Sequence, residues 1–133
     1  MADPPKKGEL EIQQSRLTAV ENKYPHRDYE ISVILPEFTC MCPVTGYPDF
    51  AVIRLRYIPD KTIIELKSLK LYINRFRNES IFHEEAANRI LEDLVACCSP
   101  RWMEVVGDFN PRGNVKTVVR AEHNAGFKKE KTD

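Results

Sequence analysis

The chain lacks the features that mark a binder of membranes or of bulk nucleic acid. Among its 133 residues, 20 Lys and Arg balance 20 Asp and Glu, so the formal net charge is +0. A protein that binds nucleic acid through the phosphates shows a basic excess, which is missing here. No apolar run approaches the ~20 residues of a membrane helix, and the charged start has no apolar core like that of a signal peptide. We therefore predict a cytoplasmic protein with neither a membrane nor nucleic acid as a direct partner.

Two common sequence frameworks are also absent. The chain has 5 glycines and no G-x-G-x-x-G, so a Rossmann cofactor site is not indicated. Its 4 cysteines occur as a C-x-C and an adjacent pair, which is not the spacing of a secreted disulfide framework. Hydrophobic residues make up 42% and charged residues 30%, a composition typical of one folded domain of ordinary size.

The two ends of the chain are polar, and the middle contains the hydrophobic patterns. Residues 1–27 predict a flexible N-terminal arm with a short helix near Glu9 to Glu21. Residues 28–122 predict a single domain. Residues 123–133, rich in Lys and Glu, predict a charged C-terminal tail that frays.

Hydrophobic periodicity within the middle predicts four strands and two helices. Alternation predicts strands over residues 29–35, 51–57, 102–109 and 115–121, the first ending at Pro36. Apolar residues three and four apart predict one helix from Glu65 and another with Ser80 as its N-cap, ending near Ser99. The order strand-strand-helix-helix-strand-strand predicts an α+β fold, with an antiparallel sheet that has both helices on one face. Its exposed edges invite strand pairing between subunits.

The segment from Glu37 to Asp49, between the first two predicted strands, contains the strongest candidates for chemistry. Cys42 is followed by a glycine and prolines, and rigid connections of this kind often hold functional side chains. The alternative is that Cys42 is a small buried hydrophobe. Asp49 could exchange a proton with a reacting group, or it could form a turn.

A zinc site is a competing interpretation. Soft ligands are available in sufficient number: Cys40, Cys42, Cys97, Cys98 and His83. However, the cysteines lack the usual C-x2-C spacing, and Cys97 and Cys98 would lie about 100° apart on a helix. Cys98 continues the apolar stripe of that helix and is predicted to be core, so we predict no metal site.

Three other polar groups allow two interpretations each. His83 and Glu84 at a helix start form a favourable charged first turn, or Glu84 accepts hydrogen bonds from a heterocycle. Lys67 and Lys70 belong to a basic stripe along one helix. This stripe is either a solvent-exposed face or a phosphate-binding site. Arg112, in a Pro-Arg-Gly turn, is either a solvent-exposed side chain without a specific role or a phosphate ligand.

Several short motifs occur together between residues 28 and 120. They are the octet ELKSLKLY at Glu65–Tyr72, the loop CPVTGYPDF at Cys42–Phe50 and the triplet FHE at Phe82–Glu84. Pro111-Arg112-Gly113 also fits, with Asn114 where a second glycine is common. The set resembles the NADPH-dependent 7-cyano-7-deazaguanine reductases, the nitrile reductases of queuosine biosynthesis, a tRNA modification pathway.

This resemblance implies a tunnelling fold whose subunits form rings by edge-to-edge strand pairing, with active sites at subunit interfaces. For the short, single-domain type it implies a homo-oligomer of two stacked pentameric rings, a decamer. GTP cyclohydrolase I has the same fold and uses zinc. A zinc-dependent cyclohydrolase-like enzyme and a non-catalytic purine-binding ring protein are therefore the alternative functions.

The resemblance also implies roles for individual residues. Cys42 would attack the nitrile of the nucleobase substrate and form a thioimidate, with Asp49 moving the proton. NADPH would then deliver two hydrides and give 7-aminomethyl-7-deazaguanine. The implied substrate-binding residues are Ile64, Glu65, Leu66, His83 and Glu84. The implied ligands of the NADPH phosphates are Lys67, Lys70 and Arg112.

Overall fold

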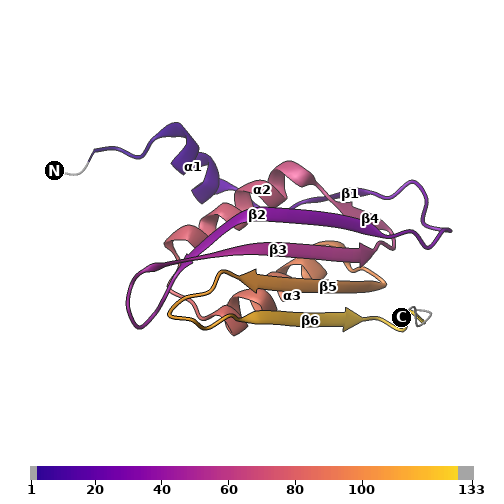
Figure 1. Ribbon diagram of the computed structural model, residues 1–133. Coiled ribbons are helices and arrows are strands. Elements are labelled where there is room, and N and C mark those ends of the chain that lie inside the picture. The colour runs from indigo at the N-terminus through magenta and orange to yellow at the C-terminus, as the bar shows by residue number, and fades with distance from the viewer. Residues whose placement is uncertain (1–2, 129–133) are drawn as a thin grey trace.

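A four-stranded antiparallel sheet forms the body of the computed structural model, which describes residues 3–128 (Figure 1). Its strands follow the order β2-β3-β5-β6 across the sheet. They are β2 (Ile31–Met41), β3 (Pro48–Ile58), β5 (Trp102–Phe109) and β6 (Val118–Asn124). A second, two-stranded antiparallel sheet joins β1 (Ala19–Glu21) to β4 (Thr62–Ile64).

Helices cover one face of the large sheet (Figure 1). They are α2 (Leu66–Asn74), the short 3-10 helix η1 (Arg75–Asn78) and α3 (His83–Cys98), while α1 (Lys7–Gln14) lies near the N-terminus. Across residues 3–128 there is no helix with the length and apolar character needed to cross a membrane. The predicted α+β architecture, with an antiparallel sheet and helices on one face, is confirmed.

The core lies between the sheet and the helices α2, η1 and α3. On β3, Ile53, Leu55 and Tyr57 are buried, whereas Arg54 and Arg56 between them point to the uncovered face. This alternation is the period of two expected of a strand with one face against helices. Cys98 is buried at the end of α3, so its predicted place in the core is confirmed.

β2 differs from its prediction in length. The strand passes through Pro36 and continues to Met41, so the prediction that it ends at Pro36 is wrong. The register against β3 shifts by one residue between Leu35 and Phe38, which is a β-bulge. A proline is tolerated in an edge strand at a bulge because no ladder hydrogen bond from its nitrogen is needed.

Two other predicted boundaries are wrong. The second long helix begins at His83 rather than after Ser80, because Ser80 pairs as an isolated bridge with Met41. The last strand spans Val118–Asn124 rather than residues 115–121, so it includes the first two residues of the predicted tail. Residues 129–133 of that tail lie outside the described residues.

The N-terminal segment contains more structure than a loose arm. Its helix ends at Gln14 rather than near Glu21, and residues 19–21 form β1, which pairs with β4. Asn22 is buried, with 3% of its surface exposed, and its side-chain amide donates to the Asp60 carbonyl at 2.7 Å. The small β1–β4 sheet therefore ties this segment to the rest of the molecule.

Candidate active site

A tight turn at the end of β2 holds Cys42. The Cys42 amide donates to the Tyr47 carbonyl at 2.9 Å, and the Gly46 amide donates to the Cys42 carbonyl at 2.8 Å. Gly46 has φ +75°, a left-handed conformation that glycine adopts without steric cost. The turn thus closes with the thiol at the exposed tip of the sheet.

A short extended segment brings the start of α3 to the same place. The Met41 amide donates to the Glu79 carbonyl at 2.9 Å, and the Ile81 amide donates to the Met41 carbonyl at 3.1 Å. These bonds attach residues 79–81 to the end of β2. His83 and Glu84, the first residues of α3, therefore lie close to Cys42.

Asp49, on β3, is the central acceptor of the site. Only 8% of its surface is exposed, and its carboxylate lies 3.1 Å from His83 Nε2 and 2.9 Å from the Arg112 guanidinium. In the strand register Asp49 stands opposite Cys40, so its side chain faces the core side of the sheet. A buried carboxylate between a histidine and an arginine is suited to proton exchange.

Arg112 reaches Asp49 from a turn between β5 and β6. The amides and carbonyls of Arg112 and Val115 bond reciprocally at 3.0 Å. The two residues between them, Gly113 and Asn114, have φ of +57° and +71°. Asparagine tolerates this conformation better than most residues, which explains why Asn114 can replace the second glycine.

The imidazole of His83 is held by an aromatic ring. It stacks on Phe109 with the ring centroids 3.8 Å apart and the planes 4° from parallel. Gly107 leaves room for this ring, because a Cβ at position 107 would lie 2.9 Å from Phe109 Cε2. The end of β5 thereby fixes the orientation of His83 toward Asp49.

Predicted residues from all three classes, catalytic, substrate-binding and cofactor-binding, line one cavity of about 220 Å³. Its lining residues are Cys42, Pro43, Asp49, Phe82, His83, Glu84, Arg112, Val115 and Thr117. Small-molecule sites commonly measure about 300–1,000 Å³. The cavity is thus small for a complete substrate site.

The two cysteines at the end of β2 have opposite acid strengths. The pKa of Cys42 is lowered by hydrogen bonding to the Thr45 side chain and to the backbone of Thr45 and Val44, against a smaller raising effect of Asp49. Burial raises the pKa of Cys40 to about 11. Since the thiolate is the nucleophilic form of cysteine, the lowered pKa makes Cys42 the stronger candidate of this pair.

Five predicted site residues lie elsewhere, at the start of α2, toward the opposite end of the sheet (Figure 1). Glu65 is the N-cap of α2, and hydrogen bonds from the Ser68 and Lys67 amides lower the pKa of its carboxyl. The side chain of Ile64 is buried, whereas 63% of Leu66 is exposed. Lys67 and Lys70 are exposed on α2. None of the five lines the Cys42 cavity.

Sequence reasoning missed two residues that organise this site. Thr45 lies within the loop motif, but its contact with Cys42 depends on how the turn folds. Its hydroxyl also accepts from the Arg112 guanidinium at 3.3 Å. Phe109 ends a predicted strand, and nothing in its position along the chain indicates a partner 26 residues away.

Metal ligands are not assembled at this site. Within residues 3–128 no group of three or more His, Cys, Asp or Glu side chains is placed to hold a metal ion. Cys97 and Cys98 end α3, the helix that His83 begins, so the four cysteines do not converge. This arrangement does not favour the zinc-dependent alternative.

Comparisons with known proteins agree with the site motifs. Residues 48–128 match the family described as QueF-like protein. A relative from Prochlorococcus marinus (strain MIT 9303), named NADPH-dependent 7-cyano-7-deazaguanine reductase, is 59% identical over 122 residues, which are 92% of this chain and 90% of the relative. A relative of the same name from Aquifex aeolicus (strain VF5) is 57% identical over 122 residues, 92% of this chain and 95% of the relative.

A solved structure shares the fold. The crystal structure of the archaeosine synthase QueF-Like in the apo form superposes with a TM-score of 0.67. It is 23% identical and covers 74% of this chain and 96% of that chain. The fold, the match over β3 to β6 and the identity along nearly the whole length show that this chain belongs to the QueF family.

Proposed function

We propose that this chain reduces 7-cyano-7-deazaguanine to 7-aminomethyl-7-deazaguanine with NADPH. The observation that supports this most directly is an activated thiol, Cys42, in one cavity with the Asp49–His83 pair. Relatives with 53% to 60% identity share the name NADPH-dependent 7-cyano-7-deazaguanine reductase. A nitrile is a poor hydride acceptor, so a nucleophile that first adds to its carbon makes the reduction easier.

The first step is addition of Cys42 to the nitrile carbon. A C–S bond forms, one π bond of the C≡N group breaks, and the nitrogen takes a proton, which gives a thioimidate. Asp49, which lines the same cavity as Cys42, receives the thiol proton and passes it to this nitrogen. His83, 3.1 Å from the Asp49 carboxylate, positions that carboxylate and can share its proton.

Two molecules of NADPH, bound one after the other, would each supply one hydride, the first to the thioimidate carbon and the second to the imine carbon, and would each leave as NADP⁺. Between these steps the C–S bond breaks and Cys42 leaves as the thiolate. The hydrogen bonds from Thr45 that lower its pKa also make Cys42 a better leaving group. The amine nitrogen receives its remaining protons through the Asp49–His83 pair.

Recognition of the nucleobase is assigned to the rim of the cavity. Glu84, exposed in the first turn of α3, can accept hydrogen bonds from the ring N–H and the amino group of a deazaguanine. The ring of Phe82 is 52% exposed beside it and offers a face for stacking. Together they cover one side of a bicyclic base.

The rest of the substrate pocket is proposed to come from a second copy of the chain. Ile64, Glu65 and Leu66 lie too far along the sheet to reach Cys42 of their own copy, because the eleven residues of β3 separate the two ends. The small cavity at Cys42 is consistent with a site that a partner completes. The uncovered edges of β2 and β6 offer the pairing surfaces for rings, for which we propose two stacked pentamers.

The same second copy would bring Lys67 and Lys70 toward the NADPH phosphates, since both ammonium groups are exposed on α2. Arg112 is a weaker candidate for that role because its guanidinium already bonds Asp49, Thr45 and the Pro48 carbonyl. We place the reaction in the cytoplasm, a reducing compartment in which the four free thiols persist.

The direct test is intact-protein mass spectrometry after mixing with 7-cyano-7-deazaguanine in the absence of NADPH. The wild type should gain the mass of the nitrile compound, and Cys42→Ala should gain nothing. Cys97→Ala is the matched control and should behave as the wild type, because Cys97 lies at the other end of α3. Absence of the adduct on folded, reduced wild type would refute the proposed function.

A further inference from the structure

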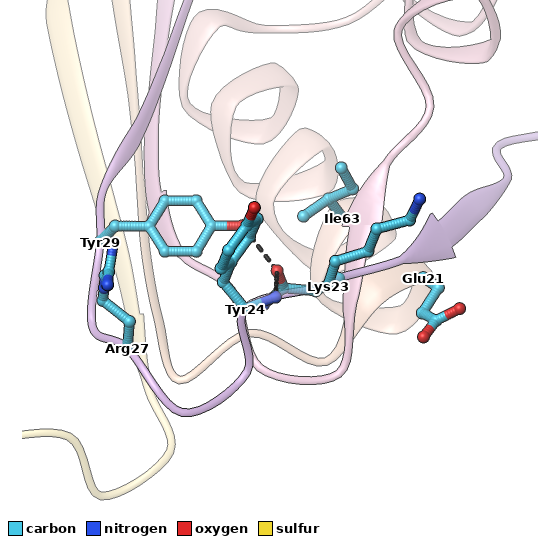
Figure 2. Close-up of a pocket in the computed structure, with 7 residues that line it drawn as sticks. Glu21, Lys23, Tyr24, Arg27, Tyr29 and Ile63 are labelled. Atoms are coloured by element: carbon cyan, nitrogen blue, oxygen red, sulfur yellow. Dashed lines mark hydrogen bonds between the residues drawn. The ribbon is translucent and has the colours of Figure 1, made fainter.

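A second pocket, of about 580 Å³, lies beside the β1–β4 sheet, away from the Cys42 cavity (Figure 2). Tyrosine rings and an isoleucine form much of its wall, and two basic side chains lie at its rim. Its lining residues are Glu21, Asn22, Lys23, Tyr24, Arg27, Tyr29 and Ile63. This volume falls within the range of small-molecule sites.

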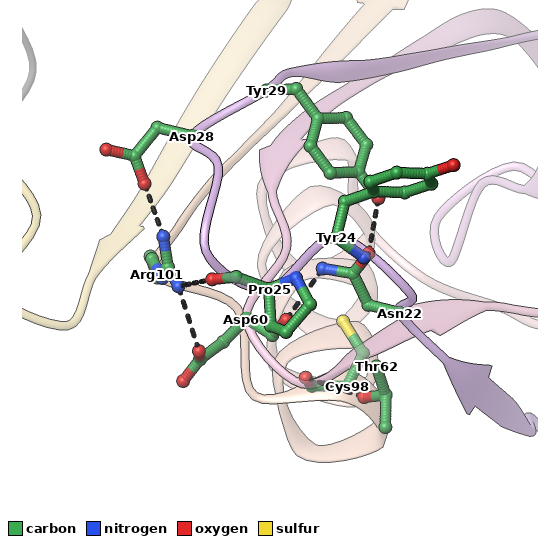
Figure 3. Close-up of polar contacts among 9 residues, drawn as sticks. All are labelled: Asn22, Tyr24, Pro25, Asp28, Tyr29, Asp60, Thr62, Cys98 and Arg101. Atoms are coloured by element: carbon green, nitrogen blue, oxygen red, sulfur yellow. Dashed lines mark hydrogen bonds and ion pairs between the residues drawn. The ribbon is translucent and has the colours of Figure 1, made fainter.

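The wall of this pocket is held in place by a buried amide. The Asn22 side-chain oxygen accepts from the Tyr29 hydroxyl at 2.6 Å and from the Tyr24 amide at 3.0 Å (Figure 3). Its nitrogen donates to the Asp60 carbonyl at 2.7 Å. Both polar atoms of the Asn22 side chain therefore form hydrogen bonds. These bonds fix the positions of Tyr24 and Tyr29 before a ligand binds.

A clamp on the outer side fixes the loop between the two tyrosines. The Arg101 guanidinium bonds the Asp28 carboxylate and the Pro25 carbonyl, and it lies 3.3 Å from the Asp60 carboxylate (Figure 3). These contacts tie residues 25–28 to the β3–β4 turn and to the start of β5. The pocket is therefore a preformed feature of the fold.

The rim combines aromatic faces with positive charges that no carboxylate among the described residues pairs with. The Arg27 guanidinium carbon lies 6.0 Å from the centroid of the Tyr24 ring. In the part of the chain that the structure describes, neither Arg27 nor Lys23 has an ion-pair partner. The carboxylate of Glu21 lies at the opposite end of the pocket from Arg27 (Figure 2). Aromatic rings with nearby cations suit a base that bears a phosphate.

The position of the pocket relates it to the reaction. Ile63, in its wall, lies on β4 directly before Ile64, Glu65 and Leu66, the residues assigned to the partner's nucleobase pocket. Lys67, assigned to the NADPH phosphates, follows on α2. An extended dinucleotide that crosses this segment would place its far end at the Tyr24–Arg27 loop.

We propose that this pocket binds the adenosine 2′-phosphate end of NADPH. Tyr24 and Tyr29 receive the adenine, and Arg27 with Lys23 binds the 2′-phosphate. The inference rests on the proposed function and names a binding site for its reductant. It predicts that the choice of NADPH over NADH depends on Arg27.

The test is calorimetric titration of the full chain with adenosine 2′,5′-bisphosphate and, separately, with 5′-ADP, which lacks the 2′-phosphate. The wild type should prefer the 2′,5′ compound. Arg27→Ala should lose about tenfold or more in affinity for that compound and little for 5′-ADP. Tyr24→Ala should weaken both, because the adenine loses its platform.

Arg16→Ala is the matched control, because Arg16 is exposed and lies outside this pocket, and it should bind both compounds as the wild type does. Arg27→Gln replaces Arg27→Ala if the latter does not fold. Binding that is absent in the wild type, or unchanged in the Arg27 and Tyr24 variants, would overturn the proposal. A change in oligomer mass with unchanged binding would assign the pocket to an interface instead and would equally overturn it.

The adduct experiment separates this inference from the proposed function. The thioimidate forms without NADPH, so Arg27→Ala should give the full adduct mass while its KM for NADPH rises. If the wild type forms no adduct, the proposed function fails. If the adduct forms and the 2′,5′ compound does not respond to Arg27, only the pocket assignment fails.

Discussion

The two ends of the molecule are each organised by one buried polar side chain, but the two side chains differ in chemistry. Asp49, 8% exposed, pairs with His83 and Arg112 at the Cys42 end. Asn22, 3% exposed, fixes Tyr24 and Tyr29 at the β1–β4 end. A carboxylate can bind and release a proton at ordinary pH, and an amide cannot.

Under the two proposals, the Asp49 end holds the thiol chemistry and the Asn22 end binds the adenosine phosphate of the cofactor. The Asp49 end has an activated thiol but only a small cavity. The Asn22 end has aromatic walls and cations without an ion-pair partner among the described residues, and the Cys98 side chain close to it is buried in the core. Each end supplies what the other lacks, which favours a site assembled from two copies.

The largest effect is expected from mixing two inactive variants. Cys42→Ala should lose at least about a thousandfold in turnover, since it removes the nucleophile, and Glu65→Ala should lose most of its substrate binding. After unfolding and refolding the two together, activity should reappear, because some interfaces pair an intact Cys42 with an intact Glu65 from the other copy. Turnover of NADPH measures this directly.

The matched control is a mixture of Cys42→Ala with Glu84→Ala. Both residues line the same cavity of one copy, so no interface in that mixture regains an intact pair. Activity in the control mixture, or none in the Glu65 mixture, would contradict a shared site.

Asp49→Asn should slow adduct formation by about a hundredfold or more. The substitution keeps the shape of the side chain but replaces the carboxylate by an amide, as at Asn22. The Cys42 end then has no side chain at position 49 that can accept a proton. The rate is measured by stopping the reaction with acid and weighing the intact protein. An unchanged rate would remove Asp49 from proton transfer, and circular dichroism would show whether the fold is intact.

Asn22→Ala should affect stability and cofactor binding but not the thiol chemistry. Removing a buried amide leaves the Asp60 carbonyl and Tyr29 hydroxyl without their partner, which should cost about 1–3 kcal/mol in the free energy of unfolding. Urea denaturation measures that cost. A parallel loss in the rate of adduct formation would show that the two ends are not independent.

Thr45→Val should have the smallest effect. The Thr45 hydrogen bond lowers the pKa of Cys42, so its removal raises that pKa and reduces the thiolate fraction at neutral pH. Alkylation by iodoacetamide at pH 7 should slow about two- to fivefold, and the rate–pH curve should move to higher pH. A Cys97→Ala background removes the other partly exposed thiol, and Cys40, with a pKa of about 11, contributes little at pH 7. An unchanged rate–pH curve would show that Thr45 does not lower the pKa of Cys42.

Sequence patterns predicted the regular parts of the fold and failed where tertiary pairing decides. The alternation on β3 and the apolar spacing on α3 led to the correct elements. Ser80 is a good N-cap by residue type. However, the backbone of residues 79–81 pairs with Met41, so the helix begins only at His83. Pro36 ends most strands, but a bulged edge strand accommodates it.

The site was predictable to a similar degree. The loop, the helix start and the Pro-Arg-Gly turn led to Cys42, Asp49, His83, Glu84 and Arg112, which line one cavity of the fold. Ile64, Glu65 and Leu66 lie outside that cavity, and their part in the site stays a proposal that needs a second copy. The Asn22 pocket was missed because prolines and charges near it are typical of a loose arm, whereas the burial of Asn22 results from pairing with β4.

The bulge in β2 has a consequence for insertions and deletions. Leu35 and Phe38 both face the core only because one extra residue separates the two halves of the strand. Deleting Glu37 would remove that extra residue and leave Leu35 and Phe38 two apart, so both would still face the core in strict alternation. Deleting Thr39 instead would leave Phe38 and Cys42 three apart, on opposite faces of the strand. The loss of one codon is therefore compatible with the position of the thiol when it falls at the bulge, and incompatible with it two residues later.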